Sequence, residues 1–398
     1  MTEAAQTYDP DERRDTPLAL KLKERIRADG PMLLSEYMDA CLFDPEHGYY
    51  KSQRAIGAAG DFVTAPEISQ VFGELVGLWC AVTWKQLGSP SPFNLVELGP
   101  GRGTMMRDIL RATRIVPGFL DAARVALVET SPILRERQKE TLHEARAPVE
   151  WFRHWGELPD GPMILVANEY LDAFPVNQWR FAPNQPGERK HGLAPQFCRA
   201  NWQIRCVGLD ERGELNFHWS SGERFWTYFQ EFGPGWAISD ASHLNDGDII
   251  EWRNVPISEY GCDFWKLWNR TGAALVIDYG HLKTAAGDTL QAVRAHKFEH
   301  PLTSPGEADL TTHVSFEEFQ SSVTRGYENA FFDGPTTQAE FLGRLGIIER
   351  ASKLMGANPG KAGEIEAGVM RLMAPNGMGT RFKVIGIRSP DVATLPGF

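Results

Sequence analysis

The chain has 398 residues, 42% of them hydrophobic, so it can bury a sizeable core in one large domain with a smaller appendage. Its 41 basic and 52 acidic residues give a formal charge of −11 without a long basic tract. This argues against a nucleic-acid partner, because phosphate backbones are bound by clustered Lys and Arg. The five cysteines never form a CxxC pair, which argues against a disulfide framework or a zinc site and fits a reducing compartment.

Residues 1–16 are acidic and polar, and they resemble neither a signal peptide nor an Arg-rich transit peptide. We therefore expect a disordered tail on a cytoplasmic protein. No apolar run approaches the roughly 20 residues that a membrane-spanning helix needs, so we expect no membrane span.

Residues 17–90 read as an N-terminal helical cap with a lid loop. Apolar periodicity predicts helices over 18–30, 32–43 and 70–88, separated by a stretch rich in glycine and aromatic residues. The end of that stretch, "GDFVTAPE", contains Asp61, Thr64 and Glu67. It could fold over a ligand as a lid, or it could be a capped turn before the next helix. Composition alone does not decide between them.

From residue 91 to 398 the pattern changes to short apolar strands that alternate with helices, which predicts a parallel, doubly wound α/β sheet. Residues 175–270 interrupt this rhythm with Trp-rich alternating segments, which we interpret as antiparallel β-hairpins inserted before a fifth strand, "AALVIDYG". His296 and His300 stand four residues apart but have no acidic third ligand nearby, so we expect no metal site.

The most informative stretch is "LVELGPGRG", in which Glu97 ends a strand and Gly99, Gly101 and Gly103 follow before a helix. The backbone N–H groups and the helix dipole of such a loop face a ligand at the carboxyl end of the strand. A carboxylate at Glu97 would repel a pyrophosphate, whereas it would attract the ammonium group of an amino-acid ligand. S-adenosylmethionine carries such an ammonium group.

Glu129 ends the next strand in "ALVET", where its carboxylate can accept hydrogen bonds from both hydroxyls of a ribose. Dinucleotides also require an acidic residue at this place, so Glu129 supports a ribose without choosing the cofactor. Two alternatives remain at this point: a nicotinamide cofactor, and three glycines that only make a tight strand-to-helix turn.

"VANEYLDAFPV" follows the fourth strand and places Asn168, Glu169 and Asp172 at the mouth of the same cleft. These residues could orient a methyl acceptor and accept its proton, or they could cap a helix. The segment lacks the proline pair of DNA aminomethyltransferases, which argues against methylation of bases. Asp278, in "VIDYG", ends the fifth strand at the same edge of the sheet.

Taken in order, "GDFVTAPEIS", "VELGPGRGTMMRDIL", "VANEYLDAFPV", "VIDYG", "PGEADLTTHV" and "TTQAEFLGRLGI" resemble the MidA family of protein arginine methyltransferases, which are associated with the assembly of respiratory complex I. The resemblance implies a class I, Rossmann-like methyltransferase that uses S-adenosylmethionine. It also implies a protein substrate such as a complex I subunit, and a homodimer is a further candidate assembly. The chain lacks the transit peptide of the mitochondrial members, which puts organelle and substrate in doubt.

Carried over residue by residue, the resemblance assigns the cofactor to Glu97, Gly99, Gly101, Gly103 and Glu129, and it matches Asn168, Glu169 and Asp172 to a family motif. Asn168 and Thr64 are our further candidates for cofactor binding. Glu169 and Asp172 are our candidates for the catalytic carboxylates that bind a guanidinium group and assist loss of its proton, with Asp61, Glu67 and Asp278 in reserve. Two rival hypotheses remain: a non-catalytic assembly factor that only binds the cofactor, and a small-molecule methyltransferase.

Overall fold

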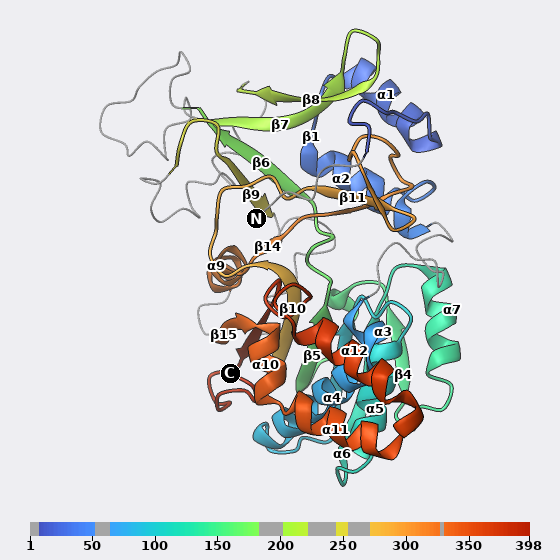
Figure 1. Ribbon diagram of the computed structural model, residues 1–398, viewed down its shortest axis with the longest axis vertical. Coiled ribbons are helices and arrows are strands. Elements are labelled where there is room, and N and C mark those ends of the chain that lie inside the picture. The colour runs from blue at the N-terminus through green and yellow to red at the C-terminus, as the bar shows by residue number, and fades with distance from the viewer. Residues whose placement is uncertain (1–7, 52–63, 183–201, 222–243, 254–270, 327–329) are drawn as a thin grey trace. The chain divides into compact units, whose positions relative to one another are not determined.

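A computed structural model describes residues 8–51, 64–182, 202–221, 244–253, 271–326 and 330–398 (Figure 1). Contacts divide the chain into two compact units. Unit 1 combines Met1–Phe62, Asp172–Val255 and Lys283–Glu318, and unit 2 combines Val63–Leu171, Pro256–Leu282 and Phe319–Phe398. This division differs from the predicted boundary at residue 90, because the cap is split between the two units.

Unit 2 is built on a mostly parallel sheet. Its strands are β2 (Phe93–Leu98), β3 (Ala123–Val128), β4 (Val149–Phe152), β5 (Met163–Asn168), β10 (Gly272–His281), β15 (Phe331–Thr337) and β16 (Phe382–Arg388). They lie in the order β15-β16-β10-β5-β2-β3-β4. β2, β3, β4, β5 and β10 pair in parallel, and β16 runs antiparallel to both of its neighbours. The predicted class I, Rossmann-like α/β fold is confirmed.

Chain order reverses between β2 and β5. The strands β2, β3 and β4 extend the sheet in one direction, and β5 returns to pair on the other side of β2. In doubly wound sheets, ligands bind at such a switch point, outside the carboxyl ends of the strands. The strand order therefore directs attention to the segments that follow Leu98 and Asn168.

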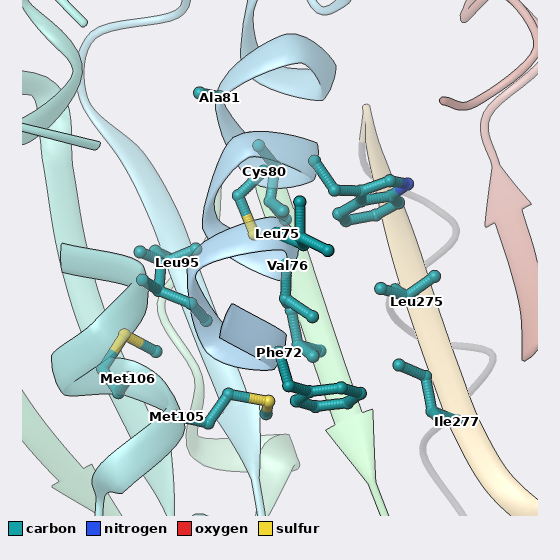
Figure 2. Close-up of a cluster of buried hydrophobic side chains, with 14 of the residues drawn as sticks. Phe72, Leu75, Val76, Cys80, Ala81, Leu95, Met105, Met106, Leu275 and Ile277 are labelled. Atoms are coloured by element: carbon teal, nitrogen blue, oxygen red, sulfur yellow. The ribbon is translucent and has the colours of Figure 1, made fainter. Parts of the chain in front are cut away.

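The helices of unit 2 are short to medium in length. They are α3 (Ala65–Ile68), α4 (Gln70–Gln86), α5 (Thr104–Thr113), α6 (Phe119–Ala122), α7 (Pro132–Thr141), α10 (Gln338–Arg344), α11 (Ile347–Ala357) and α12 (Ala362–Met373), together with the 3-10 turns Trp155–Glu157 and Pro359–Lys361. In the main core, Phe72 and Leu75 of α4 lie among Met105 of α5 and Leu275 and Ile277 of β10 (Figure 2).

Helices α4 and α5 approach each other closely because two glycines of α4 face α5. A Cβ atom at Gly77 would lie 2.9 Å from the Cα atom of Ile109, and one at Gly73 would lie 2.7 Å from the Cβ atom of Asp108. Because α5 begins directly after the glycine loop, this close contact with α4 holds the end of the loop at the core.

Unit 1 contains the N-terminal helices and the inserted strands. Its elements are α1 (Pro17–Asp29), β1 (Met32–Leu33), α2 (Leu34–Phe43), the 3-10 turn Tyr49–Lys51, β6 (Val176–Phe181), β7 (Trp202–Leu209), β8 (Leu215–Ser220), β9 (Ile249–Arg253), β11 (Gln291–Arg294), β12 (Lys297–Glu299), β13 (Asp309–Thr311) and β14 (Val314–Ser315). The pairs β6–β7, β7–β8, β6–β9 and β1–β7 are antiparallel. The expected antiparallel insertion is present. The helix α9 (Phe316–Gly326) begins in unit 1 and ends in unit 2.

Three details of unit 1 and the C-terminal region differ from expectation. Residues 32–33 form the edge strand β1 rather than the start of a helix, and the helices α11 and α12 were not predicted. Within the expected disordered tail, Arg14 donates from its backbone to Thr303 and pairs with Glu307, so residues 8–16 are held in place. Among the described residues, no helix has the length and apolar character needed to cross a membrane.

Candidate functional site

The glycine loop lies at the switch point of unit 2. Gly99, Gly101 and Gly103 have positive φ values of 57°, 52° and 80°, a region that side-chain-bearing residues avoid. Gly99 donates to Val128, which ends the neighbouring strand, and Gly103 is the N-cap of α5. The backbone therefore favours glycine at all three positions.

The surroundings of the glycines differ. A Cβ atom at Gly99 would lie 2.8 Å from the Tyr170 ring, and one at Gly103 would lie 3.5 Å from Gln138, whereas nothing lies within 4 Å of the Cβ position at Gly101. Gly99 thus allows the loop to pack closely against Tyr170, whereas the distance at Gly103 is an ordinary contact. Gly101 leaves open space in which a ligand can approach the backbone.

Glu97 ends β2 as a buried carboxylate. Only 2% of the residue is exposed, and Oε2 has no hydrogen-bond partner among the described residues. Burial raises the pKa of Glu97 to about 8, against a hydrogen bond from the backbone of Met106. A buried carboxylate with one oxygen unsatisfied is unfavourable, and a cationic ligand would relieve this penalty.

Asn168 ends β5, which is adjacent to β2, and it is also buried. Its Oδ1 atom has no partner among the described residues, while its Nδ2 atom donates to Oε1 of Glu169 at 3.1 Å. The structure therefore brings two unpaired acceptor oxygens, one from Glu97 and one from Asn168, to the carboxyl ends of neighbouring strands. An ammonium group is a donor that such acceptors can bind.

Glu169 has φ +50°, a left-handed conformation that costs about 1–2 kcal/mol for a residue with a side chain. Its Oε1 atom also accepts from the backbone N–H of Ala65 at 3.0 Å. Strained residues of this kind are concentrated at functional sites because the surrounding structure must hold them in place. The strained backbone marks Glu169 as a candidate residue of the site, and its part in binding and catalysis stays a prediction.

Asp278 holds this turn through hydrogen bonds to its backbone. It is fully buried, and its Oδ2 atom accepts from the backbone N–H groups of Tyr170 at 3.1 Å and Leu171 at 2.8 Å. Its carboxylate is enclosed and engaged with the main chain. We accordingly assign Asp278 to shaping the turn after β5 rather than to binding an acceptor.

Asp172 belongs to unit 1, where its backbone carbonyl accepts from Thr312 at 3.2 Å. It is buried, with 7% of the residue exposed. Because Glu169 belongs to unit 2, the pairing of these two carboxylates stays a prediction.

Glu129 follows β3 and is held at both carboxylate oxygens. Oε1 accepts from the backbone N–H of Ser131 at 2.7 Å, and Oε2 accepts from Nε2 of Gln138 at 3.3 Å. Burial raises the pKa of Glu129, and these two hydrogen bonds oppose the rise. The arrangement presents a fixed acceptor, as binding of a ribose diol requires.

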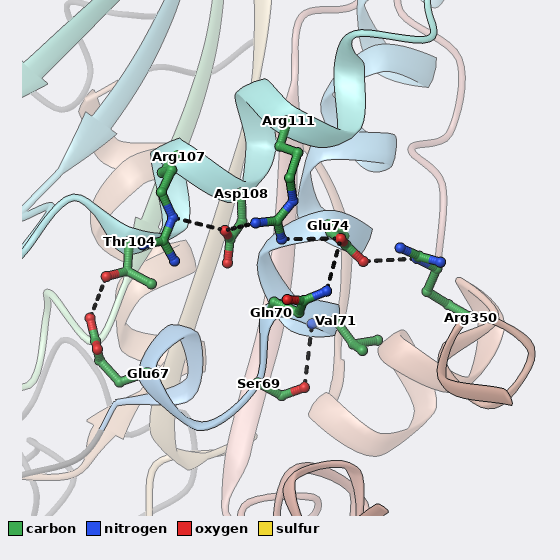
Figure 3. Close-up of polar contacts among 10 residues, drawn as sticks. All are labelled: Glu67, Ser69, Gln70, Val71, Glu74, Thr104, Arg107, Asp108, Arg111 and Arg350. Atoms are coloured by element: carbon green, nitrogen blue, oxygen red, sulfur yellow. Dashed lines mark hydrogen bonds and ion pairs between the residues drawn. The ribbon is translucent and has the colours of Figure 1, made fainter. Parts of the chain in front are cut away.

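The segment before α4 contacts both the glycine loop and the first residue of α5; the contact with α5 is drawn in Figure 3. Glu67 of α3 accepts a hydrogen bond of 2.5 Å from the hydroxyl of Thr104, and it lies 3.5 Å from the Arg102 guanidinium. Thr64 is the N-cap of α3, but its side chain makes no capping bond. Glu67 of α3 thus contacts Arg102 of the loop. A lid over the ligand stays a prediction, and Asp61 lies outside the described residues.

Further along α5, a polar network joins three helices (Figure 3). Arg111 bonds to Glu74 and Asp108, and Arg350 of α11 bonds to the other oxygen of Glu74 at 2.8 Å. These residues neutralise one another within the helical layer. We therefore interpret the network as structural. In the described parts of the chain, no group of three or more His, Cys, Asp or Glu residues could hold a metal ion.

A Rossmann-like sheet with a glycine loop, a buried glutamate near the end of β2 and a fixed one after β3 is the arrangement expected of an S-adenosylmethionine-dependent methyltransferase. Comparison with known proteins agrees. Residues 75–333 match the model of a family described as "Putative S-adenosyl-L-methionine-dependent methyltransferase", and the chain belongs to this family.

Relatives cover nearly the whole chain. The protein arginine methyltransferase NDUFAF7 homolog, mitochondrial, of Drosophila melanogaster is 34% identical over 93% of this chain and 84% of that protein. The human mitochondrial protein arginine methyltransferase NDUFAF7 is 32% identical over 95% of this chain and 85% of that protein. A crystal structure from Burkholderia thailandensis, bound to S-adenosyl-homocysteine, has a TM-score of 0.78 and 26% identity, covering 96% of this chain and 94% of that one.

The cofactor is S-adenosylmethionine. The described residues fit it, because Glu97 and Asn168 can receive its ammonium group, Gly101 leaves room beside the loop, and Glu129 can receive its ribose hydroxyls. Sequence reasoning missed Gln138 and the Asp278 contacts with the turn. Gln138 lies on helix α7 and Asp278 on strand β10, and the local sequence does not indicate which groups either residue will contact.

Proposed function

We propose that this methyltransferase modifies an arginine side chain of a protein. The observation that carries the proposal is the position of Glu169, whose carboxylate is held in a strained turn directly after β5, beside Asn168, while Tyr170 of the same turn lies against Gly99. The names of the relatives, which are protein arginine methyltransferases, support the same acceptor.

The chemistry requires a carboxylate at this place. A guanidinium group has a pKa above 12 and is a poor nucleophile while it is charged. S-adenosylmethionine supplies an activated methyl group. Glu169 would bind the guanidinium fork, orient one nitrogen and receive the proton that this nitrogen exchanges for the methyl group. Asp172 is the second carboxylate that we propose for this task.

The test separates catalysis from cofactor binding. Glu169→Gln should reduce methyl transfer from radiolabelled cofactor into a lysate of the protein's own cells by at least about a hundredfold, with little change in affinity for S-adenosylhomocysteine. Glu144→Gln is the matched control, because the Glu144 side chain is 80% exposed. Equal losses of turnover and affinity would remove Glu169 from the catalytic residues.

Mass spectrometry of the labelled protein then identifies the acceptor. We propose a respiratory complex I subunit as this acceptor, on the basis of the family resemblance, and modified arginine is the expected residue. Label on another type of side chain, or on a small molecule, would contradict the proposal. The cytoplasmic location and a homodimer stay proposals, to be tested by cell fractionation and sedimentation.

A further inference from the structure

Gln138, on α7, is a residue of the cofactor site with no role assigned so far. It is completely buried, and both ends of its amide are engaged. Nε2 donates to the carbonyl of Gly101 at 2.8 Å and to Oε2 of Glu129 at 3.3 Å, and Oε1 accepts from the indole N–H of Trp151 at 2.9 Å. A single side chain therefore joins the glycine loop, the end of β3 and the strand β4.

These bonds complete the fixation of Glu129. The backbone of Ser131 holds Oε1, and Gln138 holds Oε2, so the plane of the carboxylate cannot turn without breaking one of the two bonds. The same amide also fixes the carbonyl of Gly101, the glycine that has open space at its Cβ position. The orientation of Glu129 is thereby tied to the conformation of the loop.

We propose that Gln138 is a positioning residue that sets the Glu129 carboxylate for the two ribose hydroxyls of the cofactor. It acts through Glu129 and through the glycine loop, and it touches no reacting atom. The inference depends on the assignment of Glu129 to the ribose and is independent of the methyl acceptor.

The chemistry of the side chain explains why an amide suits this position. A neutral amide is both donor and acceptor, and it can satisfy a carboxylate, a carbonyl and an indole N–H together. An apolar side chain would leave these three buried groups without their partner. A glutamate would accept from Trp151 but would face Glu129 as a second carboxylate, and like charges at close range disfavour ionisation of both.

The experiment measures a ligand preference rather than an activity. Calorimetry of the full chain compares S-adenosylhomocysteine with an analogue that lacks both ribose hydroxyls. In the wild type we expect the diol ligand to bind more tightly. In Gln138→Met, affinity for the diol ligand should fall by about tenfold, while affinity for the analogue should change by less than about threefold.

Two further variants make the outcome decisive. Arg137→Met introduces methionine at the neighbouring residue of α7, whose side chain is 47% exposed. This control should leave the ligand preference unchanged. In a Glu129→Gln background, Gln138→Met should have no further effect on the preference, because the group that it positions is already altered. Equal losses for both ligands, or additive effects in the double variant, would overturn the proposal.

Should Gln138→Met fail to fold, Gln138→Glu keeps the size of the side chain and the bond from Trp151. Thermal unfolding without ligand establishes that the variant is folded. The expected result is again a reduced preference for the diol ligand. An unchanged preference would show that Gln138 serves only the packing of α7.

Discussion

The two ends of the cofactor site use a buried glutamate in opposite ways. At the end of β2, Glu97 has an oxygen without a partner among the described residues, and its pKa is raised to about 8. At the end of β3, both oxygens of Glu129 are held by Ser131 and Gln138. We expect the first glutamate to act through its charge once a cation binds, and the second to act through its orientation, which Ser131 and Gln138 already hold.

The largest expected effect comes from removing the charge. Glu97→Gln should weaken binding of S-adenosylhomocysteine on the order of a hundredfold, because it removes a charge-assisted hydrogen bond in a buried place. Glu129→Gln should cost only about tenfold, because the amide keeps part of the hydrogen bonding.

Calorimetry at pH 8 gives both values, with Glu144→Gln as the exposed control. An analogue without the amino group should not distinguish Glu97→Gln from the wild type. Similar losses of affinity for the two glutamate variants with every ligand would contradict the difference between Glu97 and Glu129.

The next effect concerns the close contact between helices α4 and α5. The added Cβ atom in Gly77→Ala would meet the Ile109 backbone of α5 at 2.9 Å, and such overpacking costs about 1–3 kcal/mol. Because alanine gains roughly 1 kcal/mol over glycine in a helix, we expect a net destabilisation of up to about 2 kcal/mol.

Thermal or denaturant unfolding measures the change. Gly356→Ala, in α11, is the matched control, since nothing lies within 4 Å of its Cβ position, and it should leave stability unchanged or raise it. A stable Gly77→Ala variant would show that α4 and α5 can move apart without loss.

A smaller effect follows from pH. Below its raised pKa of about 8, Glu97 in the ligand-free protein is mostly protonated and must lose its proton to pair with an ammonium group. Affinity for S-adenosylhomocysteine should therefore rise by up to about tenfold per pH unit between pH 6 and 7.5.

Calorimetry in buffers of different ionisation enthalpy should detect proton release on binding. Glu97→Gln should show neither the slope nor the release. The reverse slope, or an equal slope in the variant, would assign the titration to another group.

The smallest effect is expected at the contact between the lid segment and the loop. Glu67→Gln weakens the ion pair with Arg102, whose side chain is 39% exposed, so the change in cofactor affinity should not exceed about fivefold. Added salt should reduce the difference between this variant and the wild type. A loss as large as that of Glu97→Gln would place Glu67 among the ligand-binding carboxylates.

The placement of Glu97, Glu129 and the glycines could be predicted because each stands where a short apolar strand ends, and parallel strands bring their carboxyl ends to one edge. The roles of Gln138 and Asp278 could not. Their partners lie on other segments, and a side-chain amide in a helix carries no mark of the carbonyl that it will meet.

The division into two units was also hidden from the sequence. Tyr37 and Leu42 of α2 belong to a core that includes Val176 and Val207 of the inserted strands, far away along the chain. Local composition describes α1 and α2 as amphipathic helices, but it does not say which surface they cover. For the same reason the helices at 17–90 were grouped with one another rather than with their packing partners.

The left-handed backbone at Glu169 has a consequence for how variants of this protein should be screened. Glycine is the residue that adopts this conformation without strain, so Glu169→Gly would relax the turn while it removes the carboxylate. A damaged enzyme could then melt at the same temperature as a healthy one. If Glu169 acts in catalysis as proposed, surveys that score abundance or heat resistance would overlook this position, and a direct assay of methylated product would reveal the defect.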